Sequence, residues 1–148
     1  MINDEYFLAA LRLAAGNDPI PGHVSAAARE AYDLRVPGAV TADPAERPVA
    51  RAERGENGSH SVRFVAAGLT FDLEVTVGDG LIDVTGQVFP NPGEGAHVDV
   101  RTPHLTLTRR LADTGEFAVT GLPPGWLSVV CHRPGHAPVQ TRWVRIRP

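Results

Sequence analysis

The chain has 148 residues, 43% hydrophobic and 21% charged, which suits one compact domain with a short appendage and excludes two large catalytic domains. Its formal net charge of -3 provides no overall basic field to hold nucleic acid or an anionic membrane. All fourteen basic residues are arginines, and the absence of lysine excludes Schiff-base chemistry and a P-loop. The single cysteine, Cys131, excludes an intramolecular disulfide.

The first residues do not follow the pattern of an export signal. Asp4 and Glu5 stand where a signal peptide carries positive charge, and Arg12 interrupts the apolar stretch of residues 6–15. No other stretch approaches the roughly 18 apolar residues that span a bilayer. We therefore expect a cytoplasmic protein that does not bind a membrane.

Residues 1–35 have the periodicity of a helical hairpin. One helix is predicted over residues 4–15 and a second over Pro21 to Leu34, with the prolines of residues 18–21 forming the turn between them. The apolar positions are Phe7, Leu11, Ala14 and Ala15 in the first helix and Val24, Ala27, Ala28, Ala31 and Tyr32 in the second. Because this face is mostly alanine, the hairpin buries little area alone and must pack against the rest of the chain or a partner.

The remainder of the chain has the features of a linker followed by β-strands. Residues 36–47 are rich in Pro, Ala, Gly and Asp without a period, which predicts a linker. From residue 48 onward, apolar and polar residues alternate between turn residues such as Gly78-Asp79-Gly80. Strands are predicted at 49–52, 62–65, 69–77, 82–88, 98–101, 105–109, 116–120, 127–131 and 139–146. The predicted fold is mainly β: an antiparallel, Ig-like sandwich of seven to nine strands over residues 48–148, preceded by the αα-hairpin.

The second half of this β region carries a recognisable pattern. Gly86-Gln87-Val88 is followed by Thr-Gly-x-Phe-x-Val-x-Gly-Leu-Pro-Pro-Gly at Thr114 to Gly125 and then by an apolar strand. This pattern resembles the carboxypeptidase regulatory-like, or transthyretin-like, β-sandwich. The turn at residues 113–115 begins a strand whose Phe117 and Val119 we expect to point inward. Because sandwiches host many unrelated activities, this resemblance implies a fold and no reaction.

A second resemblance covers nearly the whole chain. The segment from Asp18-Pro19-Ile20-Pro21 to Tyr32, and the ending Trp143-Val144-Arg145-Ile146, are similar to a family of small actinobacterial proteins. Their genes commonly lie beside those of extracytoplasmic-function (ECF) sigma factors and caspase-like CHAT-domain proteins. The resemblance implies a regulatory or adaptor protein without enzymatic activity. This chain departs from the family at Asp33 to Gly38, which ends the second helix early.

Cys131, His132 and His136 are the one cluster of soft metal ligands near one another in sequence. The His-x3-His spacing is admissible for zinc, so a small metal- or ligand-binding domain is the alternative function. Against it, Cys131 falls on the inward side of the strand at residues 127–131, where His132 points to the opposite face. No Gly-x-Ser-x-Gly or Gly-x-Gly-x-x-Gly motif occurs, so we expect no enzymatic activity and no cofactor.

The C-terminal segment is basic. Its last 17 residues contain four arginines and no acid, and Trp143 alternates with the apolar Val144 and Ile146. A solvated strand face is one interpretation, whereas an outward tryptophan among arginines is typical of a protein-binding anchor. We predict a non-enzymatic protein-interaction module that binds a protein partner and no nucleic acid, and a purely structural sandwich is a further alternative. The candidate contact residues are Phe7, Leu8, Leu11, Tyr32, Arg142, Trp143 and Arg145.

Overall fold

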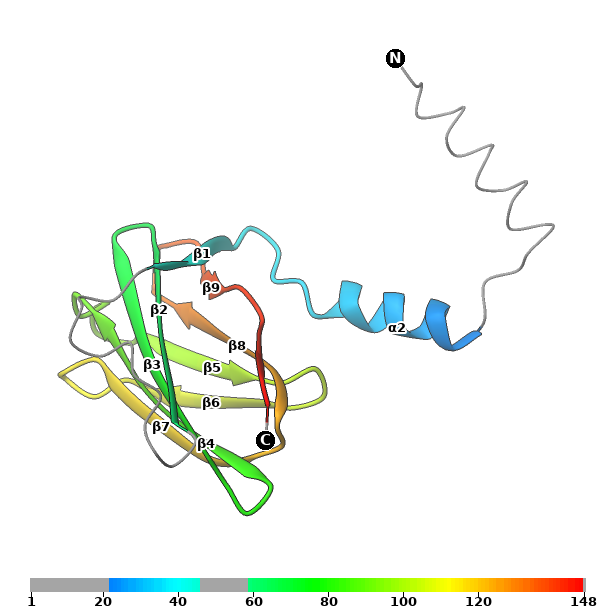
Figure 1. Cartoon of the computed structure of the whole chain (residues 1–148). Helices are drawn as coiled ribbons and strands as arrows, with labels where there is room; N and C mark the ends of the chain where they lie inside the picture. The colour runs from blue at the N-terminus through cyan, green and yellow to red at the C-terminus, as the bar shows by residue number, and fades with distance from the viewer. Residues whose placement is uncertain (1–21, 46–58, 148) are drawn as a thin grey trace, which may run out of the picture. The chain divides into compact units, whose positions relative to one another are not determined.

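The computed structural model describes residues 22–45 and 59–147, and the chain divides into two compact units, residues 1–35 and 36–148. In the first unit, helix α2 spans Gly22–Asp33 and confirms the second predicted helix (Figure 1). The predicted helix at 4–15 and the predicted strand at 49–52 lie outside the described residues. Among the described helices, none has the length and apolarity to cross a membrane.

The second unit is mainly β. Within its described residues the strands are β1 Val40–Ala45, β2 Ser59–Ala66, β3 Leu69–Gly78, β4 Leu81–Phe89, β5 His97–Arg101, β6 Thr106–Arg110, β7 Glu116–Leu122, β8 Gly125–His132, β9 Val139–Thr141 and β10 Val144–Ile146. They form one mixed sheet in the order β6-β5-β8-β9-β1-β2-β3-β4-β7, and β10 also pairs with β8. The pairing of β1 with β9 is parallel, whereas the sequence predicted antiparallel strands throughout.

Strand β1 lies within the segment that was predicted to be a linker, so this part of the linker prediction was wrong. Its first three residues pair with β9 and its last three with β2, so the strand joins the two halves of the sheet. Only Ala42 of the strand is buried, and Asp43 and Pro44 are residue types that strands disfavour. The strand therefore depends on partners distant in the sequence, and local pattern could not indicate it.

The single strand predicted at 139–146 is divided into β9 and β10. Both pair with β8, but Gln140 lies opposite Val130 whereas Val144 lies opposite Leu127. The shift corresponds to one extra residue on the β9–β10 side, as in a β-bulge. Trp143 immediately precedes β10 and lies at this irregularity.

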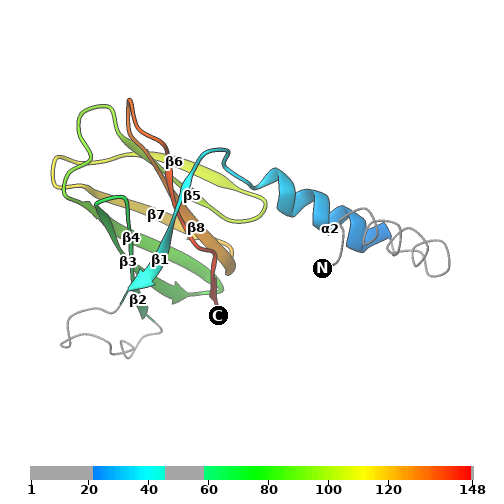
Figure 2. The same cartoon turned by 90° about the horizontal axis from the view of Figure 1, so that it is seen from above.

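One hydrophobic core lies between the two halves of the sheet. Figure 1 shows β5, β6 and β8 crossing β2, β3, β4 and β7, and Figure 2 shows the same arrangement from above. Inward side chains from both groups make up this core, among them Phe64, Phe71, Leu73, Ile82, Val84, Val98, Val100, Phe117, Leu127, Val129 and Cys131. Alternation places the inward residues of β3 and β4 in this core, as the sequence predicted.

The glycines of the recognised pattern have packing reasons. Gly86 lies opposite Phe117 across β4 and β7, and a Cβ at Gly86 would collide with the aromatic ring. Gly115 has a φ of +82°, and a Cβ there would collide with the carbonyl oxygen of Val88. Phe117 is buried, as expected, and covers the space that Gly86 leaves open.

Candidate functional site

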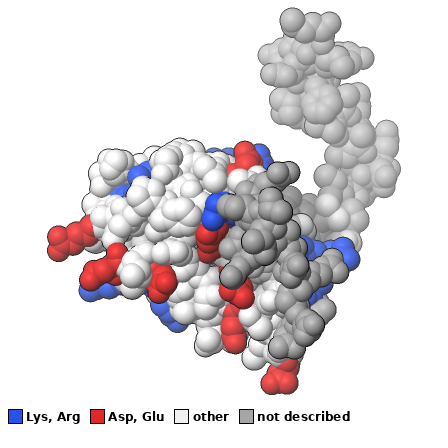
Figure 3. Space-filling model, turned by 60° about the vertical axis from the view of Figure 1, so that its left-hand side comes forward, with Lys and Arg blue, Asp and Glu red and all other residues white. Residues whose placement is uncertain are grey.

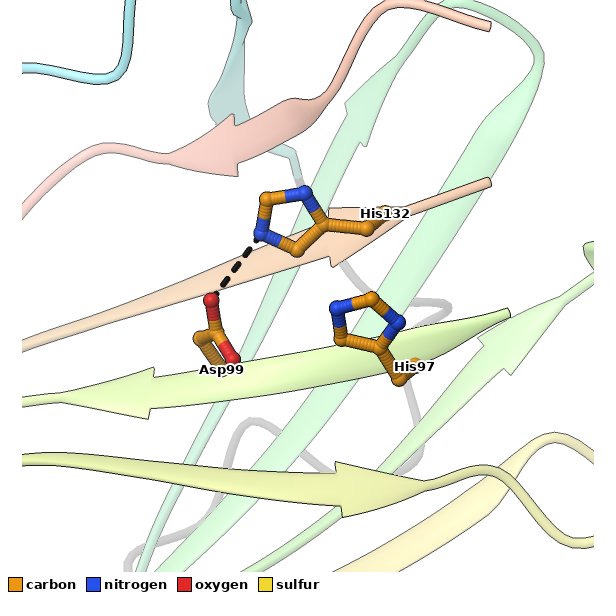
Figure 4. A group of neighbouring side chains, drawn as sticks. All are labelled: His97, Asp99 and His132. Carbon is orange, nitrogen blue, oxygen red and sulfur yellow. Dashed lines mark hydrogen bonds and ion pairs between the residues drawn. The ribbon is translucent and has the colours of Figure 1, made fainter. Parts of the chain in front are cut away.

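Three potential ligand side chains meet on the outer face of strands β5 and β8. Val98 and Val100 of β5 point into the core, so the alternate residues His97 and Asp99 point to the other side. His132 of β8 lies directly opposite His97 in the strand pairing. Figure 4 shows the three side chains projecting from these neighbouring strands toward one another. We call this group the His–Asp cluster.

The atoms of the His–Asp cluster are close together. His132 Nε2 lies 2.9 Å from Asp99 Oδ2, and the rings of His97 and His132 are stacked with centroids 4.7 Å apart. One potential ligand atom from each residue lies within 4.8 Å of the other two. The Thr108 hydroxyl on β6 donates a 2.7 Å hydrogen bond to Asp99 Oδ1, which fixes the carboxylate while Oδ2 faces His132. The cluster therefore offers two imidazoles and one oriented carboxylate.

The cluster is partly open to solvent. The side chains of His132 and Asp99 are 31% and 21% exposed. His97 and Thr108 also line a hollow of about 980 Å³, together with Arg110 and with Asn91 and residues 93–96 of the loop after β4. An ion or small molecule can therefore approach the cluster without a movement of the backbone.

The ligand set predicted from sequence does not come together. Cys131 lies fully buried in the core, on the face of β8 opposite to His132, and His136 is exposed in the turn after β8. Burial raises the pKa of the Cys131 thiol to about 11, and the charge of Arg133 opposes this only in part. Across residues 22–45 and 59–147, the His–Asp cluster is the one group of three such ligands. Of the predicted set, only His132 belongs to it.

His97 and Asp99 were missed because the sequence search considered ligands near one another in the chain. Their signal was the His-x-Asp spacing inside an alternating strand, which places both side chains on one face. His132 is 33 residues from Asp99, and only the pairing of β5 with β8 brings them together.

A second feature of the outer face is a group of tryptophans and arginines, which we call the tryptophan face: Arg101, Trp126, Trp143 and Arg145. Trp126 is 49% exposed and lies opposite Arg145 in the pairing of β8 with β10. The Arg101 guanidinium lies 5.0 Å from the centre of the Trp143 ring, and its Nη2 donates to Ser128 Oγ at 3.3 Å. Trp143 thus contacts the Arg101 side chain outside the core and points outward, as the sequence predicts. The exposed position of Trp126 was not predicted.

Arg101 is an unusual member of the tryptophan face because it is only 7% exposed. Burial lowers the pKa of its guanidinium, and attraction to Asp99 opposes the shift. Asp99 therefore interacts with both groups. It is hydrogen-bonded to His132 in the His–Asp cluster, and its charge attracts Arg101 of the tryptophan face.

The remaining predicted contact residues have different surroundings. Arg142 is exposed and its Nε donates to the Asp43 carboxylate of β1. Tyr32 is 65% exposed on α2, with the Arg35 guanidinium 4.6 Å from the centre of its ring. Phe7, Leu8 and Leu11 lie outside the described residues.

Charges of both signs lie on the face of the molecule that Figure 3 shows. In the view of Figure 3, acidic and basic side chains of the described residues are interspersed and do not merge into one basic patch. This face therefore differs from the continuous positive surface that phosphate-backbone binding uses. Comparisons with protein-family models, curated proteins and solved structures found no match to this chain.

Proposed function

We propose that this chain is a non-enzymatic, cytoplasmic protein-interaction module whose β unit binds a protein partner through the tryptophan face. The observation that carries the proposal is Trp126, which is half exposed and lies beside Arg145 on one face of the sheet. Tryptophan and arginine are the residue types that contribute most to binding at protein interfaces. Trp143, whose ring lies beside the Arg101 guanidinium, extends the same face.

The chemistry of the tryptophan face indicates the kind of partner. Its two tryptophans favour an apolar side chain, and its arginines favour carboxylates around that side chain. The last 17 residues, which include Arg145, carry four arginines and no acidic residue. The partner we propose is therefore a protein surface that presents an apolar residue flanked by Asp or Glu.

Helix α2 offers a second contact surface for the same function. Val24 and Tyr32 lie two turns apart, on the apolar face that the sequence pattern predicts, and are 46% and 65% exposed. Exposed apolar residues on one face of a helix are typical of helices that pack into a groove of a partner.

The resemblance to actinobacterial proteins supplies the candidate partners, an ECF-type sigma factor or a CHAT-domain protein encoded nearby, and a regulatory role. We further propose that the β unit is a transthyretin-like sandwich. Support comes from the motif residues: Gly86 accommodates the ring of Phe117, and Gly115 has the positive φ that a turn before β7 needs. The crossing of the two strand groups around one core agrees with this proposal.

The test is titration of the purified full chain with the purified products of its neighbouring genes, followed by calorimetry. Trp126→Ala should weaken binding by at least tenfold, because truncation of a central tryptophan commonly costs about 2 kcal/mol or more. Arg145→Glu should also weaken binding, and the loss of affinity should be larger at low salt than at high salt because salt screens the interaction between charges. Tyr32→Ala tests the helix separately.

The matched control is Leu81→Ala, which truncates another exposed apolar residue, 47% exposed, in the hairpin between β3 and β4. Binding should be unchanged in this variant. The proposal is wrong if neither neighbouring product binds, or if Trp126→Ala and Arg145→Glu bind as tightly as the natural chain while they remain folded by circular dichroism.

A further inference from the structure

We propose that His97, Asp99 and His132 form a Zn²⁺ site on the outer face of β5 and β8, with one coordination position open to water (Figure 4). This proposal goes beyond the protein-binding function: its ligands are not members of the tryptophan face, although Asp99 also attracts Arg101 of that face. It also replaces Cys131 and His136, which the sequence suggested as ligands, with His97 and Asp99.

The donor set decides the kind of ion. Two imidazole nitrogens and one carboxylate oxygen match the three protein ligands of zinc sites that keep their fourth position for water. Mg²⁺ and Ca²⁺ prefer oxygen ligands throughout, and the cluster offers oxygen from Asp99 alone. Zinc is therefore the ion that the residues of this cluster fit.

The distances permit this ion with small side-chain movements. Around a tetrahedral zinc with bonds of about 2.0–2.1 Å, ligand atoms lie about 3.3 Å from each other. His132 Nε2 and Asp99 Oδ2 are 2.9 Å apart, and the potential ligand atoms of all three residues lie within 4.8 Å of one another. A slight separation of His132 Nε2 from Asp99 Oδ2, together with a rotation of the His97 ring toward them, brings the three ligand atoms to tetrahedral spacing. Zinc then takes the place of the hydrogen between His132 and Asp99.

The surroundings hold the ligands in place. All three residues belong to hydrogen-bonded strands, in which His97 is paired with both His132 of β8 and Arg110 of β6. Thr108 donates to the Asp99 oxygen that faces away from His132, the kind of outer hydrogen bond that orients metal-binding carboxylates. The partial exposure of His132 and Asp99, and the hollow beside His97, leave room for a water on the fourth position.

The competing interpretation is a His–Asp ion pair with a stacked histidine, which would need no metal. Calorimetric titration of the full chain, without an affinity tag, with ZnCl₂ separates the two. We expect one Zn²⁺ per chain. His97→Gln, Asp99→Asn and His132→Gln should each weaken zinc affinity by at least tenfold, because each removes one of three ligands and keeps the size and polarity of the side chain.

The controls are His104→Gln and His136→Gln, which change exposed histidines outside the cluster and should leave zinc affinity unchanged. Thermal unfolding without metal shows whether each variant is folded. In the folded natural chain, Co²⁺ should produce the visible absorption of a four-coordinate site, and Asp99→Asn should lose it. The proposal is overturned if the natural chain binds no zinc in stoichiometric amount, or if folded cluster variants bind zinc as tightly as the controls.

Discussion

Strands β3 and β8 both lie inside the sheet, yet their outer faces differ. In β3 the inward residues Leu69, Phe71, Leu73 and Val75 are buried and the residues between them are at least partly exposed. In β8 five consecutive residues, 127–131, are buried, so both faces of the strand are covered. On β3 the outer face carries Asp72, which binds the Arg63 guanidinium through two hydrogen bonds of 2.7 and 2.8 Å.

The outer face of β8, unlike that of β3, is covered by a second layer of side-chain contacts. Ser128 and Val130 of β8 point away from the core but are 1% exposed, and Arg101 contacts Ser128 from β5. The His–Asp cluster and the tryptophan face lie on this same side. Continuous burial along β8, in contrast to the alternation of β3, thus coincides with the face that carries both features.

The largest effect should come from the core on the β3 side. Phe117→Ala should lower the free energy of unfolding by about 3–5 kcal/mol, because the ring fills the space above Gly86. Urea denaturation measures the loss. Phe89→Ala is the matched control, since Phe89 is only partly buried, and its effect should be less than half as large. Equal losses would show that Phe117 is not a central core residue.

An intermediate effect should follow from Cys131 on the inner face of β8. Its pKa is about 11 in the folded chain, above the ordinary value near 9, because burial disfavours the thiolate. The neutral thiol therefore contributes about 2–3 kcal/mol to the free energy of unfolding. This contribution is fully present below pH 9 and is lost as the pH rises through 11. Denaturation at pH 8 and pH 11 measures it.

Cys131→Ala provides the control for this pH dependence. The variant is less stable at pH 8 because it leaves a small cavity, but its loss of stability between pH 8 and pH 11 should be smaller by that same amount. If the natural chain and Cys131→Ala lose equal stability over this range, the thiol does not account for the change.

A smaller effect should come from the polar link between β8 and β9. Thr141 Oγ1 accepts a 2.9 Å hydrogen bond from the Val129 amide, and both residues are buried. Thr141→Val leaves that amide without its acceptor and should cost about 1–3 kcal/mol of unfolding free energy. Thr76→Val changes an exposed residue of β3 and should stay within about 0.5 kcal/mol. Comparable losses in these two variants would contradict the contrast between β3 and β8.

Sequence reasoning succeeded where structure depends on local alternation. The strands at 69–77 and 82–88, the inward orientation of Phe117 and the burial of Cys131 were predicted and confirmed, because successive side chains in a strand point to opposite faces. The second helix was predicted within a residue at each end, from Pro21 to Leu34 against Gly22–Asp33. These features need no knowledge of distant neighbours.

Only the tertiary structure decided the features that depend on which strands become neighbours. β1 forms in a segment poor in strand residues because β9 and β2 supply its partners, and the register shift beside Trp143 exists because β8 pairs with both β9 and β10. The His–Asp cluster follows the same rule. Alternation by itself determined that His97 and Asp99 share a face, whereas the pairing of β5 with β8 placed His132 beside them, since register is set by contacts across the sheet.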